Sequence, residues 1–129
     1  MPEKYKDKQK EPLKVYEYAK CTTCQKAVRF LDAKKIPYEV VPIKERPPTA
    51  AELKTMLGHV GGEVRKLFNT SGILYREMGL SEKLASMTEA QAFKLLGSNG
   101  MLVKRPFVLS KTDGAVGFKE TEWKRKFAI

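Results

Sequence analysis

Two cysteines separated by two threonines, Cys21 and Cys24, lie where an alternating apolar pattern gives way to a helical one. Residues 13–19 alternate and carry branched and aromatic side chains, which is typical of a β-strand. From Ala27 onward, apolar residues recur at helical spacing until shortly before Pro37, where a helix must end. The sequence therefore predicts a strand that runs directly into a Cys-x-x-Cys motif at the start of a helix of about three turns.

The remaining strand patterns predict one α/β domain. Residues 38–41 form a second predicted strand, and the order strand–helix–strand implies parallel pairing through a right-handed crossover. Near the C-terminus, residues 107–109 and 115–118 form a predicted hairpin about an Asp-Gly turn, followed by a final helix. We therefore expect a four-stranded mixed sheet within a single domain that spans residues 13–129.

The middle of the chain predicts a helical insertion into this sheet, at about residues 45–100. Two capping boxes mark helix starts, at Thr49–Glu52 and Thr88–Gln91. Gly58 and Gly97 stand where C-terminal caps are expected. The segment is enclosed by strands that belong to one sheet, so we interpret it as an insertion and not as a second domain.

The Cys-x-x-Cys motif at a helix start has a direct chemical interpretation. Unpaired amides and the helix dipole favour an anion there, and such placement lowers a cysteine pKa to roughly 3.5–7.5. Cys21 is then the attacking thiolate, and Cys24 is the less exposed thiol that resolves a mixed disulfide. Thr22 and Thr23 are expected to contribute amides and hydroxyls to the first turn.

Two other interpretations of the cysteines stay open. The pair could be half of a zinc site, although such sites usually have four ligands and the chain has only one histidine, His59. The two thiols could instead be buried and serve packing alone, since free cysteine packs as a small hydrophobe. The shortage of ligands leads us to predict no metal site.

A second candidate site residue, Arg105, directly precedes Pro106 and the predicted strand at 107–109. The proline forces the arginine into an extended conformation. If this segment lies beside Cys21, the guanidinium could hold an anion or a thiolate. The alternative from the sequence is an ordinary surface arginine.

The net charge and the N-terminal residues indicate which partners and which cellular compartment to expect. Residues 1–12 are rich in lysine and poor in apolar side chains, so we predict a basic, disordered tail. The net charge is +10, which suits a solvated surface or anionic partners, but no nucleic-acid motif accompanies it and we expect no direct DNA binding. No segment resembles a membrane span or a signal peptide, so we expect a cytoplasmic monomer with reduced thiols and no membrane contact.

The chain resembles the arsenate reductase (ArsC)/Spx-like family over nearly its whole length, most closely the YusI-like branch. The likeness rests on four stretches: residues 18–27 around the cysteines, 68–77, 100–106 and 116–120. The resemblance implies a thioredoxin-like fold with an all-helical insertion. It also implies that Arg105-Pro106 is the cis-proline peptide beside the catalytic cysteine, which makes Arg105 and Pro106 site residues.

The chain departs from the family pattern where arsenate reductases place an oxyanion clamp. Those enzymes combine one cysteine with three arginines. Cys21 and Arg105 match, but Asn69 stands at the second arginine position and Gly117 or Phe118 at the third. Three other cations are candidates to compensate: Arg65, Lys66 and Arg76. We therefore expect two-cysteine redox chemistry with little arsenate reduction, and we include Asn69 among the candidate substrate-binding residues.

The resemblance also sets expectations about partners. It implies no bound cofactor, and glutathione with glutaredoxin, or thioredoxin, as the electron donor. The alternative function is that of an Spx-type regulator, which carries a similar redox switch and binds the C-terminal domain of the RNA polymerase α subunit.

Overall fold

A four-stranded mixed sheet forms the centre of the protein, whose computed structural model describes residues 11–129. Its strands are β1 (Leu13–Glu17), β2 (Tyr38–Pro42), β3 (Phe107–Leu109) and β4 (Gly114–Val116), in the order β2-β1-β3-β4. Strand β1 pairs parallel with β2 and antiparallel with β3, and β3 pairs antiparallel with β4. The predicted sheet and hairpin are confirmed. The last strand ends at Val116 and not at Phe118, because Gly117 has a φ of +73° and turns the chain out of the sheet.

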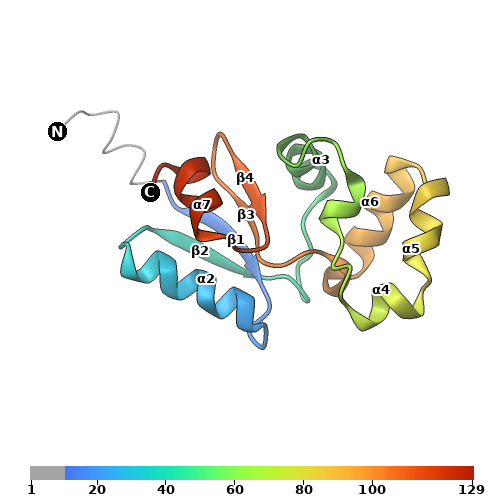
Figure 1. Cartoon of the computed structure of the whole chain (residues 1–129), viewed down its shortest axis with the longest axis horizontal. Coiled ribbons are helices and arrows are strands. Elements are labelled where there is room, and N and C mark those ends of the chain that lie inside the picture. The colour runs from blue at the N-terminus through green and yellow to red at the C-terminus, as the bar shows by residue number, and fades with distance from the viewer. Residues whose placement is uncertain (1–10) are drawn as a thin grey trace.

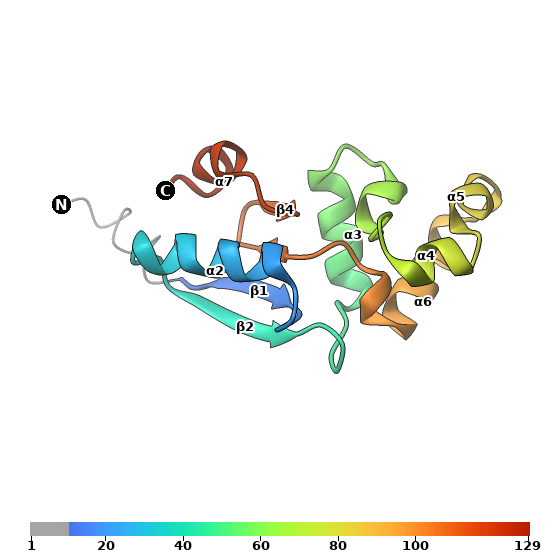
Figure 2. The same cartoon turned by 60° about the horizontal axis from the view of Figure 1, so that its bottom comes forward.

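Two helices cover one face of this sheet, one packs against the opposite face, and the others lie beyond the end of the sheet (Figures 1 and 2). The helices are α2 (Thr22–Ala33), α3 (Ala50–His59), α4 (Ile73–Glu77), α5 (Leu80–Lys83), α6 (Glu89–Ser98) and α7 (Glu120–Phe127), with short 3-10 turns η1 (Val64–Leu67), η2 (Leu84–Ser86) and η3 (Gly100–Leu102). Val15 and Val108 pack with α2 and α7 around Trp123, whereas Tyr16 and Phe107 pack on the opposite face with α3. Alternate side chains of each strand therefore enter two separate apolar clusters.

The segment between β2 and β3 is all helical, as predicted, and α3 to α6 gather at one end of the molecule (Figure 1). Both predicted capping boxes are present, at Thr49 with Glu52 and at Thr88 with Gln91. The two predicted glycine caps are wrong: Gly58 and Gly97 lie inside α3 and α6, which each continue one residue further. After α3, the chain instead turns at Gly61 and Gly62, which have positive φ.

Gly100 fixes how the insertion returns to the sheet. A Cβ atom at this position would lie 1.8 Å from the carbonyl oxygen of Ile43, which no side chain could occupy. Ile43 follows β2 and is fully buried. The start of η3 therefore packs backbone against backbone on the end of the second strand.

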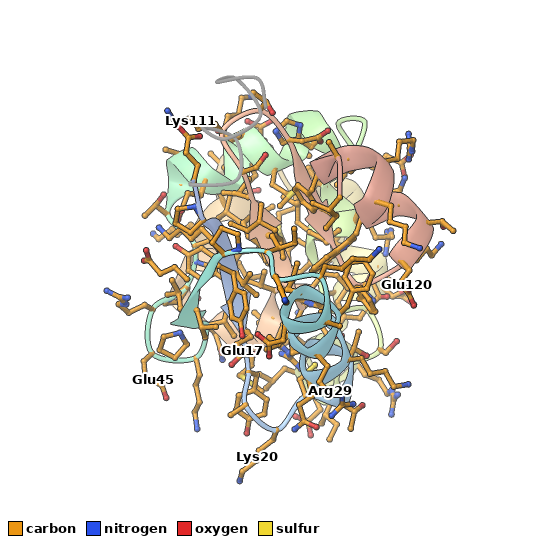
Figure 3. All side chains as sticks on the ribbon, turned by 90° about the vertical axis from the view of Figure 1, so that its left-hand side faces the viewer. Glu17, Lys20, Arg29, Glu45, Lys111 and Glu120 are labelled. Atoms are coloured by element: carbon orange, nitrogen blue, oxygen red, sulfur yellow. The ribbon has the colours of Figure 1, made fainter. Side chains whose placement is uncertain are left out.

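Most of the predicted tail lies outside the described residues. Of residues 1–12, only Glu11 and Pro12 are described, and Glu11 forms an ion pair of 2.7 Å with Lys111, which Figure 3 labels. Among residues 11–129, no helix combines the length and apolarity needed to cross a membrane.

Glu52 joins the first helix of the insertion to the central strand. One carboxylate oxygen accepts from the Tyr16 hydroxyl and from the Thr49 amide, and the other accepts from Lys14 Nζ at 2.9 Å. Burial opposes ionisation, but these hydrogen bonds hold the pKa of Glu52 below its usual value. The carboxylate thus stabilises the contact between α3 and β1 in its charged form.

We predict that Glu52→Gln lowers the free energy of unfolding at pH 7 by about 1.5–3 kcal/mol, the range for a hydrogen bond to a charged group. Because the pKa of Glu52 is lowered by folding, this stabilisation is present above the unfolded pKa of about 4.3 and is lost as the pH falls through the folded value. Urea unfolding of both proteins at pH 7 and pH 3.5 measures the difference, which should shrink at the lower pH.

Glu89→Gln is the matched control, since Glu89 pairs with Lys54 on the exposed surface and should contribute under about 1 kcal/mol. An equal loss in both variants, or a Glu52→Gln loss that persists in acid, would contradict this account.

Candidate functional site

Cys21 lies at the N-cap of α2, immediately after the turn that follows β1. Its amide donates to the Tyr18 carbonyl at 2.9 Å, and its Sγ accepts from the Cys24 amide at 3.3 Å. Both cysteines are free thiols; Cys21 is half-buried and Cys24 is 0% exposed. The predicted placement of Cys21 at a helix start is confirmed, and only Cys24 fits the interpretation of a buried packing thiol.

The two thiols have opposite proton affinities. Partial burial would raise the pKa of Cys21, but hydrogen bonds from the thiol and amide of Cys24, together with the nearby Arg105 guanidinium, lower it overall. Burial raises the pKa of Cys24 to about 12, and the adjacent Cys21 sulfur and the charge of Glu17 act in the same direction. Cys21 is therefore the more readily ionised of the two thiols.

Glu17, at the end of β1, is the acidic residue whose charge affects the pKa of Cys24. Burial raises the pKa of its carboxyl, and its charge opposes ionisation of Cys24. Figure 3 shows Glu17 beside α2, whereas Lys20 at the tip of the following turn points away from the protein. The last residue of the strand thus contributes to the electrostatics of the buried thiol.

Arg105 is held beside the motif by its own segment. The Arg105–Pro106 peptide bond is cis, as the resemblance implies. The Arg105 Nη1 donates to the Met101 carbonyl at 3.2 Å, and the guanidinium carbon lies 5.5 Å from the centre of the Tyr18 ring. Its Nε is buried and has no hydrogen-bond partner among residues 11–129. The Arg105 charge lies close enough to Cys21 to favour its thiolate form.

The other predicted site residues are distributed around this pair. Thr22 and Thr23 form the exposed first turn of α2, and in the described part of the chain neither hydroxyl bonds to Cys21. Asn69 follows η1, where its amide donates to the Leu102 carbonyl at 2.7 Å. Its side chain lies against Gly72, since a Cβ there would meet Asn69 Nδ2 at 2.8 Å. A substrate role for Asn69 stays a prediction.

The cations expected to complete an anion clamp are mostly committed elsewhere. Arg65 donates to the Tyr75 hydroxyl and to the Ser81 carbonyl inside the insertion. Lys66 pairs with Glu63 at 3.6 Å, and Arg76 is exposed on α4.

Lys104 is the cation that the sequence reasoning missed. A Cβ at Gly117 would lie 3.3 Å from Lys104 Cε, so this side chain crosses the position that the resemblance assigns to an arginine. Its place directly before Arg105-Pro106 is the signal that could have identified it.

A groove of about 920 Å³ opens beside the motif, with Thr23 and Arg105 among its lining residues. His59 also lines it, and its Nδ1 lies 3.6 Å from a carboxylate oxygen of Asp113. Within residues 11–129, no three His, Cys, Asp or Glu side chains gather as a metal site would require. The groove thus places the Arg105 guanidinium and other cations next to the motif that carries the Cys21 thiol.

Comparison with known proteins agrees with this geometry. The ArsC family model matches residues 16–126. The Bacillus subtilis protein YusI is 41% identical over 90% of this chain and 98% of its own length, and the global transcriptional regulator Spx of Listeria innocua is 27% identical over 86% and 83%. The crystal structure of a putative ArsC family related protein from Bacteroides fragilis superposes with a TM-score of 0.82, at 43% identity over 88% of this chain and 97% of that one. The thioredoxin-like fold is thereby confirmed.

We predict that iodoacetamide modifies Cys21 of the reduced protein far faster than Cys24 near pH 7. A thiol with a pKa of about 12 is ionised to only about one part in 10⁵ at that pH, and the thiolate is the reactive form. Arg105→Ala should raise the pKa of Cys21, because removing a nearby cation disfavours the anion, and should slow the labelling. Peptide mapping and thiolate absorbance against pH measure both effects.

Arg76→Ala removes the same charge from an exposed position on α4 and should leave the titration of Cys21 unchanged. Preferential labelling of Cys24, or an identical shift in the two arginine variants, would refute the assigned roles.

Proposed function

The chain belongs to the ArsC family, and on that basis we propose that it is a thiol–disulfide redox protein with Cys21 as nucleophile and Cys24 as resolving thiol. The observation that carries this proposal is the asymmetry of the two thiols. Cys21 is partly exposed at a helix N-cap with a lowered pKa, while Cys24 is fully buried with a pKa of about 12. Cys21 is thus the thiol suited to attack a substrate, and Cys24 stays protonated until the mixed disulfide has formed.

In the proposed reaction, the Cys21 thiolate attacks one sulfur of a substrate disulfide. The substrate S–S bond breaks, a mixed disulfide forms on Cys21, and one substrate thiolate leaves. Cys24 then loses its proton and attacks Cys21 Sγ, which releases the second substrate thiolate and forms the Cys21–Cys24 disulfide. The substrate gains two electrons and the protein loses two. A cytoplasmic donor, glutathione with glutaredoxin or thioredoxin, would restore the dithiol.

The second step depends on the first through the charge of Cys21. The neighbouring Cys21 sulfur contributes to the raised pKa of Cys24. Once Cys21 is covalently bound in a mixed disulfide, it is neutral, and that contribution is removed. The pKa of Cys24 should therefore fall only after substrate has reacted, which couples resolution to capture.

An Spx-type regulatory function is the second candidate, favoured by the 27% identity to Spx over 86% of the chain. In that function the same disulfide would act as a switch that alters binding to the C-terminal domain of the RNA polymerase α subunit. Binding of that domain to the reduced and disulfide forms, compared with substrate turnover, separates the two functions.

We predict that Cys24→Ser accumulates a mixed disulfide on Cys21 when the reduced protein meets a disulfide substrate such as oxidised glutathione. Resolution needs the Cys24 thiol, so the adduct should persist and mass spectrometry should locate it on Cys21. Cys21→Ser is the matched control and should form no adduct, because Cys24 is buried and protonated. No adduct in either variant would refute the proposed function.

We predict weak arsenate reduction alongside efficient disulfide cycling. Arsenate and the thiolate are both negative, and Asn69 and Gly117 supply no guanidinium to offset their repulsion. Charge-assisted hydrogen bonds contribute about 1.5–3 kcal/mol each. Because the Lys104 side chain lies beside Gly117, one to two of them are lost, which weakens oxyanion binding by about 10–10⁴-fold. Arsenate-dependent NADPH oxidation with glutathione and glutaredoxin measures this; turnover equal to that of a three-arginine reductase would contradict it.

A further inference from the structure

The groove beside the motif runs between α7 and β4 on one side and the chain from His59 to Thr70 on the other. In Figure 1, β4 lies between α7 and α3, at the edge of the sheet that faces the insertion. One part of the groove reaches Thr23 and Arg105, next to Cys21. A chain bound along it would therefore reach the first turn of α2, which Cys21 caps.

The groove is strongly basic. Seven of its lining residues are Lys or Arg and two are Glu. Four of the cations have structural partners: Arg65, Lys66 and Arg105 as described above, and Lys126, which donates to the carbonyls of His59 and Gly114. The remaining cations of the groove are Lys104, Lys119 and Arg125. None of them has a carboxylate within ion-pair distance among residues 11–129. Their charge is available to a ligand.

The edge of strand β4 offers the groove a second kind of contact. In the β3–β4 pair, the Gly117 amide bonds to the Pro106 carbonyl, and Val116 lies opposite Phe107 at the next register position. Hydrogen-bonded and non-bonded pairs alternate in an antiparallel ladder, so Val116 directs its backbone N–H and C=O away from β3. Gly114 is the other outward-facing residue of β4, and its carbonyl already accepts from Lys126. Pairing with an extended peptide is therefore confined to Val116.

We propose that this groove docks an extended, acidic segment of a partner protein and presents the partner's disulfide to Cys21, a role that rests on the proposed function. Three cations without a carboxylate partner among residues 11–129, beside the outward backbone groups of Val116, fit a row of carboxylates on a polypeptide. Glutathione is a small peptide with few carboxylates and could contact only some of these three cations. The net charge of +10 would add long-range attraction for the same partner.

The variant that tests this docking is the triple change Lys104→Gln, Lys119→Gln and Arg125→Gln. Its matched control is Lys44→Gln, Arg46→Gln and Lys94→Gln, which removes two lysines and one arginine outside the groove. Two peptide disulfides of the same sequence, one flanked by Glu and the other by Gln, serve as substrates for single-turnover reduction by the dithiol protein.

The wild-type protein and the control triple should reduce the Glu-flanked peptide at least about tenfold faster than the Gln-flanked one, with the preference falling as salt is added. The groove triple should bring this ratio close to one. Equal rates for the two peptides in the wild-type protein, or equal loss in both triples, would overturn the docking role while leaving the proposed function intact.

A binding measurement keeps the two proposals separate. Fluorescence anisotropy with a linear Glu-rich peptide without cysteine, on a Cys21→Ser/Cys24→Ser background, requires no redox chemistry. Binding that is weakened at least about tenfold by the groove triple and kept by the control triple supports the docking role. No binding overturns it. Failure to reduce either peptide disulfide, together with groove-dependent binding, would refute the redox function alone.

Discussion

Strand β1 is the element on which the rest of the protein depends, because it is paired on both sides and packed on both faces. It holds β2 in parallel and β3 in antiparallel register, and Val15 and Tyr16 enter opposite apolar clusters. Such a strand is fixed along its whole length. The turn that follows it therefore delivers Cys21 to the first turn of α2 in a defined position, and its last residue, Glu17, sets part of the charge around Cys24.

The chemistry of the site follows from where the two sulfurs lie relative to that turn. Two residues, Thr22 and Thr23, separate a partly exposed sulfur that accepts from a backbone amide from one that is enclosed by the core. The same short segment thus stabilises an anion at one end and a neutral thiol at the other. Arg105 strengthens the first effect from a neighbouring segment that packs against Tyr18.

Local sequence signals identified most of the fold. The Cys-x-x-Cys motif, the capping boxes at Thr49 and Thr88 and the hairpin turn all act over a few residues, so each could be interpreted without knowing the rest of the chain. Gly58 and Gly97 were misinterpreted because helix ends depend on backbone angles that glycine permits but does not impose. Lys104 directly precedes Arg105-Pro106, which marks it as a candidate, but its proximity to Gly117 is visible only in the folded chain. The basic groove has the same origin, since its two walls are separated by more than forty residues of sequence.

The close contact at Gly100 has a consequence for how variation in this protein should be interpreted. No side chain fits between its backbone and the Ile43 carbonyl, although neither residue belongs to the thiol site. A saturation-mutagenesis screen would therefore score Gly100 as intolerant as Cys21, even in a readout of activity. The two positions would differ in abundance: substitutions at Gly100 would deplete folded protein, whereas substitutions at Cys21 would leave it in place. Measuring both quantities is what distinguishes a constraint of packing from one of chemistry in so small a domain.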